Sequence, residues 1–113
     1  FAVILHNCGN TGHCTAVMLA TGAKGYHFGN KADMITALRE CPSDVWVMGN
    51  LDPVGVFRVL TPEDVFARTE ELLTCTGEYA NFIISTGCDT PPEVPFDNIQ
   101  AFYLAVEKYN KGR

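Results

Sequence analysis

Four short apolar runs divide the chain, and a segment with helically spaced apolar residues follows each of them. The runs predict strands over residues 1–6, 25–28, 45–48 and 82–86. The periodic segments predict helices over about 13–21, from Asp33 to before Pro42, from Thr61 to Gly77, and from Asp97 onward. The pattern therefore predicts four consecutive strand–helix units.

Several helix ends carry specific signals. Thr61 is a good N-cap residue, and Pro62 suits the first helical position that follows it. Pro42 ends the second helix, and Asp97 is expected to cap the last. Trp46, within an apolar strand, is expected in the core, together with the apolar stripes of the helices: Met34, Ile35 and Leu38; Val65, Phe66, Leu72 and Leu73; Ile99, Phe102, Tyr103 and Val106.

Strands that are apolar on both faces indicate a parallel sheet covered by helices. Four βα units make half of an eight-stranded (β/α)8 barrel, which typically needs about 250 residues. A doubly wound sheet is less favoured, because the stretch from Cys8 to Cys14 lacks the G-x-G-x-x-G pattern. We expect residues 1–113 to be a single partial α/β domain, the C-terminal half of such a barrel, since the chain starts inside a strand without Met. Two open sheet edges then predict self-association or pairing with a missing N-terminal half.

Composition narrows the functional classes. A net charge of −5 without a Lys/Arg cluster argues against nucleic-acid binding. No apolar run approaches the roughly 20 residues of a membrane span, and no secretory signal is visible. The five cysteines are odd in number and the apolar content is ample for a core, so free thiols are favoured over a disulfide framework. We therefore expect a cytoplasmic protein with no nucleic-acid or membrane partner.

Polar side chains gather where the strands are predicted to end, which in a βα barrel is the active-site face. These residues are His6, Cys8, His27, Asn50, Asp52 and Cys88. Two thiolates and one imidazole, from His6, Cys8 and Cys88, match a zinc site whose fourth position stays open. The alternative is that the cysteines act as small hydrophobes and the histidine bonds to backbone.

The remaining polar candidates have two interpretations each. Asn50 and Asp52 either orient a substrate at the barrel mouth or form a turn in which Asp52 caps the next helix. His27 is a candidate fourth ligand or proton relay, or it lines the pocket. His13 and Cys14 form a possible second metal pair, although a buried free thiol is favoured for Cys14.

The order of several motifs resembles the uroporphyrinogen decarboxylase superfamily over the whole chain, which matches about the last third of a typical member. The motifs are His6-Asn-Cys-Gly9, Tyr26-His-Phe-Gly29, Gly49-Asn-Leu-Asp-Pro53, and Ser85-Thr-Gly-Cys-Asp89 through Pro95 and Asn98. The decarboxylases have Gly-His-Gly where this chain has Gly87-Cys88-Asp89. With Cys88 at this position, the chain resembles the corrinoid-dependent methyltransferase branch of the superfamily, which holds zinc through an H-x-C…C pattern.

This resemblance implies a zinc enzyme that moves a methyl group from a methylated corrinoid, presented by a partner protein, to a small-molecule thiol acceptor. His6, Cys8 and Cys88 would hold zinc, which lowers the pKa of a thiol bound at the fourth position. Members of this branch that use coenzyme M as the acceptor thiol carry an acidic residue after the second strand. This chain has Phe28-Gly29-Asn30 there, with no carboxylate, so the identity of its acceptor thiol stays open. The alternatives are a decarboxylase-like lyase of tetrapyrrole biosynthesis, which needs no metal, and an inactive half-barrel assembly module.

Overall fold

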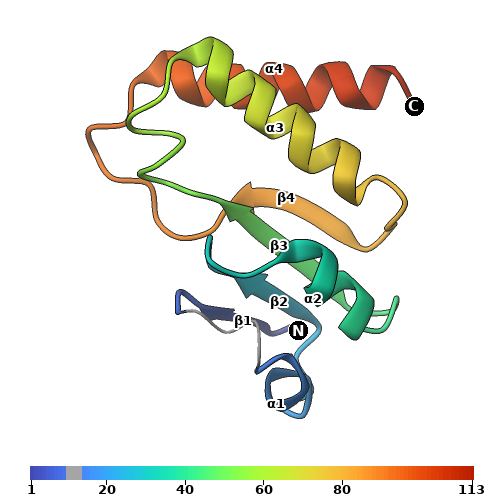
Figure 1. The fold of residues 1–113 in the computed structure, drawn as a ribbon. Coiled ribbons are helices and arrows are strands. Elements are labelled where there is room, and N and C mark those ends of the chain that lie inside the picture. Colours follow the sequence, from blue (N-terminus) through green and yellow to red (C-terminus); the bar gives the residue numbers. More distant parts are fainter. Residues whose placement is uncertain (10–13) are drawn as a thin grey trace.

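The computed structural model describes residues 1–9 and 14–113, and its centre is one parallel sheet of four strands in the order β1-β2-β3-β4. Figure 1 shows the strands side by side, with all four arrowheads pointing the same way. Their bounds are Ile4–Asn7 for β1, Gly25–Phe28 for β2, Trp46–Leu51 for β3 and Phe82–Thr86 for β4. Consecutive neighbours and a helix after each strand are what half of a (β/α)8 barrel requires.

A helix follows each strand, as the periodicity predicts. Their bounds are Thr15–Leu19 for α1, Met34–Glu40 for α2, Pro62–Thr76 for α3 and Phe96–Lys111 for α4. The predicted cap at Thr61 is present, because its hydroxyl accepts a hydrogen bond from the Asp64 N–H at 3.3 Å. Asp33 caps α2 by accepting from the Ile35 N–H at 3.1 Å. These two boundary predictions are confirmed.

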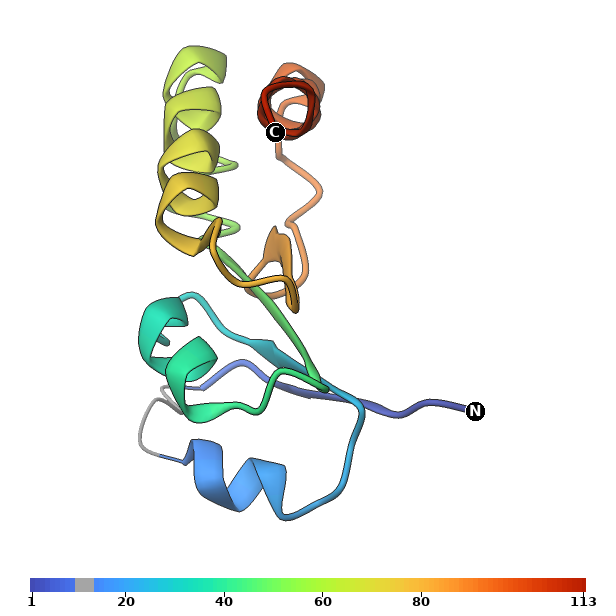
Figure 2. The same ribbon diagram turned by 90° about the vertical axis from the view of Figure 1, so that its right-hand side faces the viewer.

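The helices leave one face of the sheet uncovered. In Figure 2, α1, α2 and α3 lie on one side of the sheet, α4 lies beside α3, and the opposite side carries no helix. Tyr26, Phe28 and Val47 point to the covered side and are fully buried. A Cβ placed on Gly25 would meet Met48 and Ile4, which shows that these apolar side chains lie on the open face. In a complete barrel this face would be the interior.

Two packing predictions, for Trp46 and for Tyr103, are wrong. Trp46 lies beside Ile4 and Met48 on the open face and is 50% exposed rather than in the core. Tyr103 is 64% exposed, because α4 turns Ala101 and Ala105 inward instead. Ile35 is half-buried, as are several other residues of the predicted apolar stripes. An apolar residue in the sequence does not reveal whether a layer covers its side of the sheet.

The element ends also differ from the prediction in places. β1 starts at Ile4 and includes Asn7, so residues 1–3 lie outside the sheet. Pro95, not Asp97, takes the N-cap position of α4, and no side chain caps that end. Proline pre-sets an extended conformation that suits the residue just before a helix, and Asp97 then falls inside the first turn, where its charge still favours the helix dipole.

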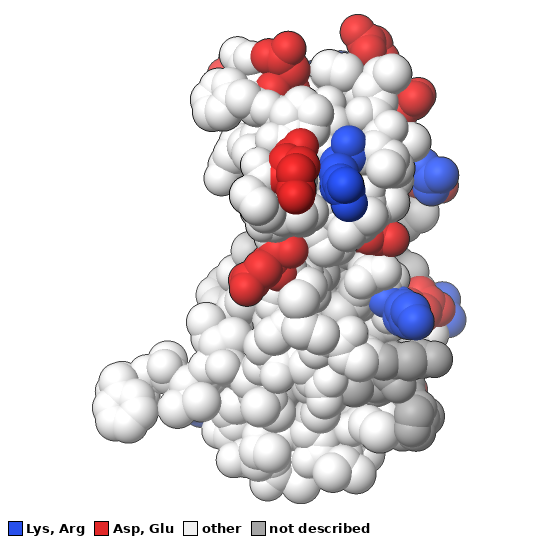
Figure 3. Space-filling view, turned by 90° about the vertical axis from the view of Figure 1, so that its left-hand side faces the viewer, with Lys and Arg blue, Asp and Glu red and all other residues white. Residues whose placement is uncertain are grey.

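Charged side chains are unevenly distributed over the end of the molecule toward which the strands point. Figure 3 shows this side, with Lys, Arg, Asp and Glu interspersed over the upper part, where α3 and α4 lie, and few charges below. On this face the basic residues do not gather into a patch. Among the described residues, no helix combines the length and apolar character needed to cross a membrane.

Candidate metal centre

The two outer strands of the sheet supply a compact cluster of soft ligands. His6 lies in β1, Cys8 follows it directly, and Cys88 comes two residues after β4. One ligand atom from each of these side chains lies within 4.8 Å of the other two. The structure thus brings together the three residues that the sequence analysis predicts as zinc ligands. The cluster is open to solvent.

The individual distances are short enough for a shared ion. His6 Nε2 lies 2.7 Å from Cys8 Sγ, and the Sγ atoms of Cys8 and Cys88 are 2.8 Å apart. Two sulfurs bound to one tetrahedral zinc, each at about 2.3 Å, lie about 3.8 Å from each other. The ligands therefore need to spread by about 1 Å, which rotation of exposed side chains allows. The donor set of one imidazole and two thiols fits zinc, with one coordination position left for another molecule.

The surroundings of the Cys8 thiol favour its neutral form while no cation is bound. Its pKa is raised above the ordinary value, chiefly because it shares a hydrogen bond with Cys88. Desolvation and the negative charges that Cys88 and Asp89 carry when ionised add to this effect. A divalent cation reverses the balance, because it stabilises the thiolate by direct bonding.

Close backbone packing carries Cys88 across two intervening strands to Cys8. A Cβ on Gly29, just after β2, would lie 2.7 Å from the Cys8 carbonyl oxygen. A Cβ on Gly87 would lie 3.0 Å from the Asn30 Cα. The loops after β1, β2 and β4 therefore touch at positions where only glycine leaves enough room. This contact lets the loop after β4 reach the first strand.

His27 lies between the metal cluster and β4. Its Nδ1 is 2.7 Å from His6 Nδ1, and its Nε2 is 2.7 Å from the Thr86 carbonyl oxygen and 2.9 Å from Ser85 Oγ. The two imidazole rings are tilted against each other, with centroids 4.5 Å apart. His27 therefore contacts a residue of the candidate cluster and uses both of its ring nitrogens in hydrogen bonds. Ser85 and Thr86 belong to the motif that begins at Ser85, but the sequence gives no reason to place them against His27, and Thr86 contributes a backbone atom that no residue pattern reveals.

Asn50 and Asp52 hold loops in place. The Asn50 amide donates hydrogen bonds to the carbonyl oxygens of Gly29 at 3.0 Å and Ala32 at 2.5 Å, which fixes the loop after β2. Asp52 Oδ1 accepts from the N–H groups of Val54 at 3.0 Å and Gly55 at 2.9 Å. Asp52 therefore forms the turn that the sequence gave as one alternative, but it does not cap the next helix, α3, whose N-cap is Thr61. Neither side chain is part of the three-residue metal cluster.

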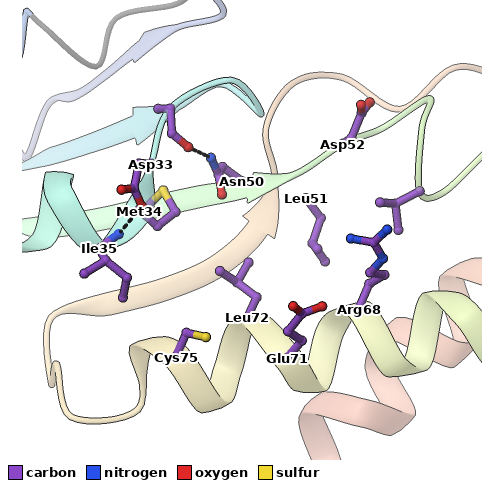
Figure 4. A pocket seen from close by; sticks show the side chains of 12 residues that line it. Asp33, Met34, Ile35, Asn50, Leu51, Asp52, Arg68, Glu71, Leu72 and Cys75 are labelled. Carbon is purple, nitrogen blue, oxygen red and sulfur yellow. Dashed lines mark hydrogen bonds between the residues drawn. The ribbon is translucent and has the colours of Figure 1, made fainter.

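A pocket lies on the helix-covered side of the sheet, and Figure 4 shows it from close by, with β3 and α3 on either side. Its volume is about 390 Å³, and Asn50, Asp52, Arg68 and Glu71 line it. His6, Cys8 and Cys88 are not among its lining residues. The cluster of His6, Cys8 and Cys88 is the better candidate for the functional site, because the residues that line the pocket do not form a comparable set of metal ligands.

The second metal pair suggested by the sequence is only partly visible. Cys14 is half-buried with a free thiol, while His13 lies outside the described residues. All five cysteines are free, as the composition predicts. Cys75 is exposed on α3, away from the cluster in sequence and in element, which makes it a useful control position.

Comparison with known proteins places this geometry in context. A family model described as uroporphyrinogen decarboxylase (URO-D) matches residues 1–109. A methylcobamide:CoM methyltransferase MtbA from Methanosarcina mazei is 32% identical over 108 residues, which is 96% of this chain and 30% of the relative. A protein with the same description from Methanosarcina acetivorans is 30% identical over 106 residues, which is 94% of this chain and 30% of that relative. The chain thus spans about a third of the length of these relatives.

A solved structure shows the same arrangement of elements. A methyltransferase from Methanosarcina mazei superposes with a TM-score of 0.83 at 20% sequence identity, covering 96% of this chain and 32% of that one. At this identity the likeness shows the fold. The predicted half of a (β/α)8 barrel, with its parallel strands and alternating helices, is confirmed.

Proposed function

Because the chain belongs to the uroporphyrinogen decarboxylase family, we propose that it carries the zinc-binding part of a methyltransferase. The proposed enzyme moves a methyl group from a corrinoid carrier, presented by a partner protein, to a thiol acceptor. The observation that carries the proposal is the convergence of His6, Cys8 and Cys88 to within 4.8 Å at the strand ends. The printed names of the relatives, methylcobamide:CoM methyltransferases, support the reaction class.

The side chains have separate roles in this proposal. His6, Cys8 and Cys88 hold the ion and leave one face of it open to an incoming thiol. Zinc bound there would lower the pKa of that thiol, so that a nucleophilic sulfur is available at neutral pH. Asn50 holds the loop after β2 against the Cys8 backbone, and Asp52 shapes the turn after β3. The overall reaction forms a sulfur–methyl bond and breaks the cobalt–methyl bond of the carrier.

A cysteine at position 88 separates this proposal from a decarboxylase-like lyase. A lyase of that type needs no metal, so it gives no reason for two thiols and an imidazole to converge. The cluster offers three ligands among the described residues, whereas a structural zinc site closes its fourth position with a further protein ligand. The metal content therefore distinguishes the two reaction classes. If the chain binds zinc but transfers no methyl group, the third alternative, an inactive assembly module, is favoured.

The test is zinc per chain by elemental analysis of freshly purified, reduced protein supplemented with zinc. We expect about one zinc in the parent and in Cys75→Ser, and a loss of most of it in Cys88→Ser. The Cys75 variant is the matched control, because it removes an exposed thiol outside the cluster. Equal zinc content in all three proteins, or none in the parent, would contradict the proposed site.

A further inference from the structure

His27 connects the Thr86 backbone to the ring of His6 through two short contacts. On one side, the Thr86 carbonyl oxygen lies 2.7 Å from His27 Nε2. On the other side, His27 Nδ1 lies 2.7 Å from His6 Nδ1. Both contacts are within hydrogen-bond range, so each needs one donor and one acceptor.

The chemistry of the carbonyl decides the first contact. A carbonyl oxygen only accepts, so His27 Nε2 must carry the hydrogen. Ser85 Oγ, at 2.9 Å from the same nitrogen, does not alter this, because its own hydroxyl is 3.0 Å from the Thr86 carbonyl and donates there. In a neutral imidazole with hydrogen on Nε2, Nδ1 is a bare acceptor.

The bare nitrogen of His27 decides the second contact. His6 Nδ1 must donate to it, and therefore carries the hydrogen of the His6 ring. The His27 carbonyl oxygen, 3.2 Å from His6 Nδ1, accepts from the same N–H and favours the same arrangement. His6 Nε2 is then left without a hydrogen, facing Cys8 Sγ at 2.7 Å. A metal needs this free lone pair, so the ring is prepared for binding before any ion arrives.

We propose that His27 is a positioning residue. It donates a hydrogen bond to the Thr86 carbonyl and accepts one from His6 Nδ1, which fixes the His6 tautomer that leaves Nε2 free. This inference rests on the proposed function for its purpose, although the tautomer itself exists without metal. Both nitrogens of His27 are occupied, so His27 is not the fourth ligand, and the open position of the site stays available to substrate. The partner of His6 is thus a second imidazole whose own orientation is set by backbone.

The experiment reads the tautomers directly in the metal-free, ¹⁵N-labelled chain. Long-range ¹H–¹⁵N correlation spectra are recorded at mildly alkaline pH. We expect a pyridine-like Nε2 and a pyrrole-like Nδ1 for His6, and the reverse for His27. A His6 ring with hydrogen on Nε2 in the parent would overturn the proposal.

Variants link the tautomer to metal binding. His27→Leu removes the acceptor and should give a mixed His6 tautomer and a zinc affinity about 10- to 100-fold weaker. His27→Asn keeps an acceptor near the Nδ1 position and should restore most of the loss. Ser85→Ala is the matched control, expected to leave the His6 tautomer unchanged. Circular dichroism verifies that each variant keeps its fold.

The two proposals fail in different ways. Zinc binding that is equal in the parent and His27→Leu, with the same His6 tautomer in both, refutes the role of His27 and leaves the zinc site intact. A parent that shows the expected tautomers but binds no zinc refutes the proposed function and leaves the hydrogen-bond chain standing.

Discussion

Cys8 and Cys88 are separated by 80 positions in the sequence, and their sulfur atoms lie 2.8 Å apart. They belong to the loops after β1 and β4, which are the two edge strands of the sheet. Two strands separate β1 from β4, and the glycine contacts between the loops let the loops after these edge strands meet. A metal held there joins the first and the last strand of the sheet.

Gly87 is the position where this arrangement is most sensitive. An alanine there places a Cβ against the backbone of Asn30 and Gly29, which cannot move aside as a flexible side chain would. We expect Gly87→Ala to displace Cys88 and to weaken zinc binding at least about tenfold, as disturbance of ligand-supporting contacts commonly does. Titration with a competing chelator measures the change. Gly112→Ala, whose Cβ would meet only ordinary contacts beyond 3.5 Å, should bind like the parent.

The proximity of the two sulfurs also predicts their oxidation behaviour. In the metal-free chain, added diamide should couple Cys8 to Cys88, because the diamide takes up the two electrons and two protons that the thiols lose. Bound zinc should suppress this coupling by occupying both thiolates. Peptide mapping by mass spectrometry identifies the pair. Coupling of Cys8 mainly to a different cysteine, or equal oxidation rates with and without zinc, would argue against the cluster.

The hydrophobic pattern predicts the order of the strands and helices, and its errors concern the burial of single residues and some element ends. Thr61 and Asp33 act as the predicted caps, whereas Asp97 does not, because Pro95 occupies the N-cap position of α4. Trp46 is half exposed, contrary to the prediction, because burial depends on a covering layer that the strand's own residues do not encode. The same holds for Tyr103, whose helix face is chosen by its packing against α3.

The candidate site shows a similar division. His6, Cys8 and Cys88 stand out in the sequence because soft ligands at strand ends are chemically distinctive. The contributions of Gly29, Gly87 and the Thr86 carbonyl depend on backbone positions, and no residue type announces them. Asn50 and Asp52 carried the right polarity but the sequence left their roles open, and the structure shows both bonded to backbone groups.

The open face of the sheet predicts association of the isolated chain. Ile4, Trp46 and Ile83 are 56%, 50% and 42% exposed, and the pairing of Met48 with Ile83 puts Ile83 on the same face. Burying such a surface against a second copy removes apolar area from water. We expect concentration-dependent self-association by light scattering, weakened about tenfold or more by Trp46→Ser.

The control for this association is Val17→Ser. Val17 is 72% exposed but lies on α1, on the helix-covered side of the sheet. The substitution removes a similar exposed apolar group but leaves the open face unchanged, so the self-association should persist. A monodisperse monomer of the parent at all concentrations would refute the expectation.

Metal removal should lower the stability of the fold as well as empty the site. A ligand that binds only the native state adds about 2.7 kcal/mol of stability at a free concentration 100 times its Kd. Zinc held by both edges of the sheet meets this condition, because the unfolded chain separates Cys88 from His6 and Cys8 by most of its length. We expect a chelator to lower the thermal midpoint of the zinc-loaded parent and of Cys75→Ser. Cys88→Ser should start at the lower midpoint and barely respond, because its site is already incomplete. An equal response in Cys88→Ser would mean that the stabilising metal binds elsewhere on the chain.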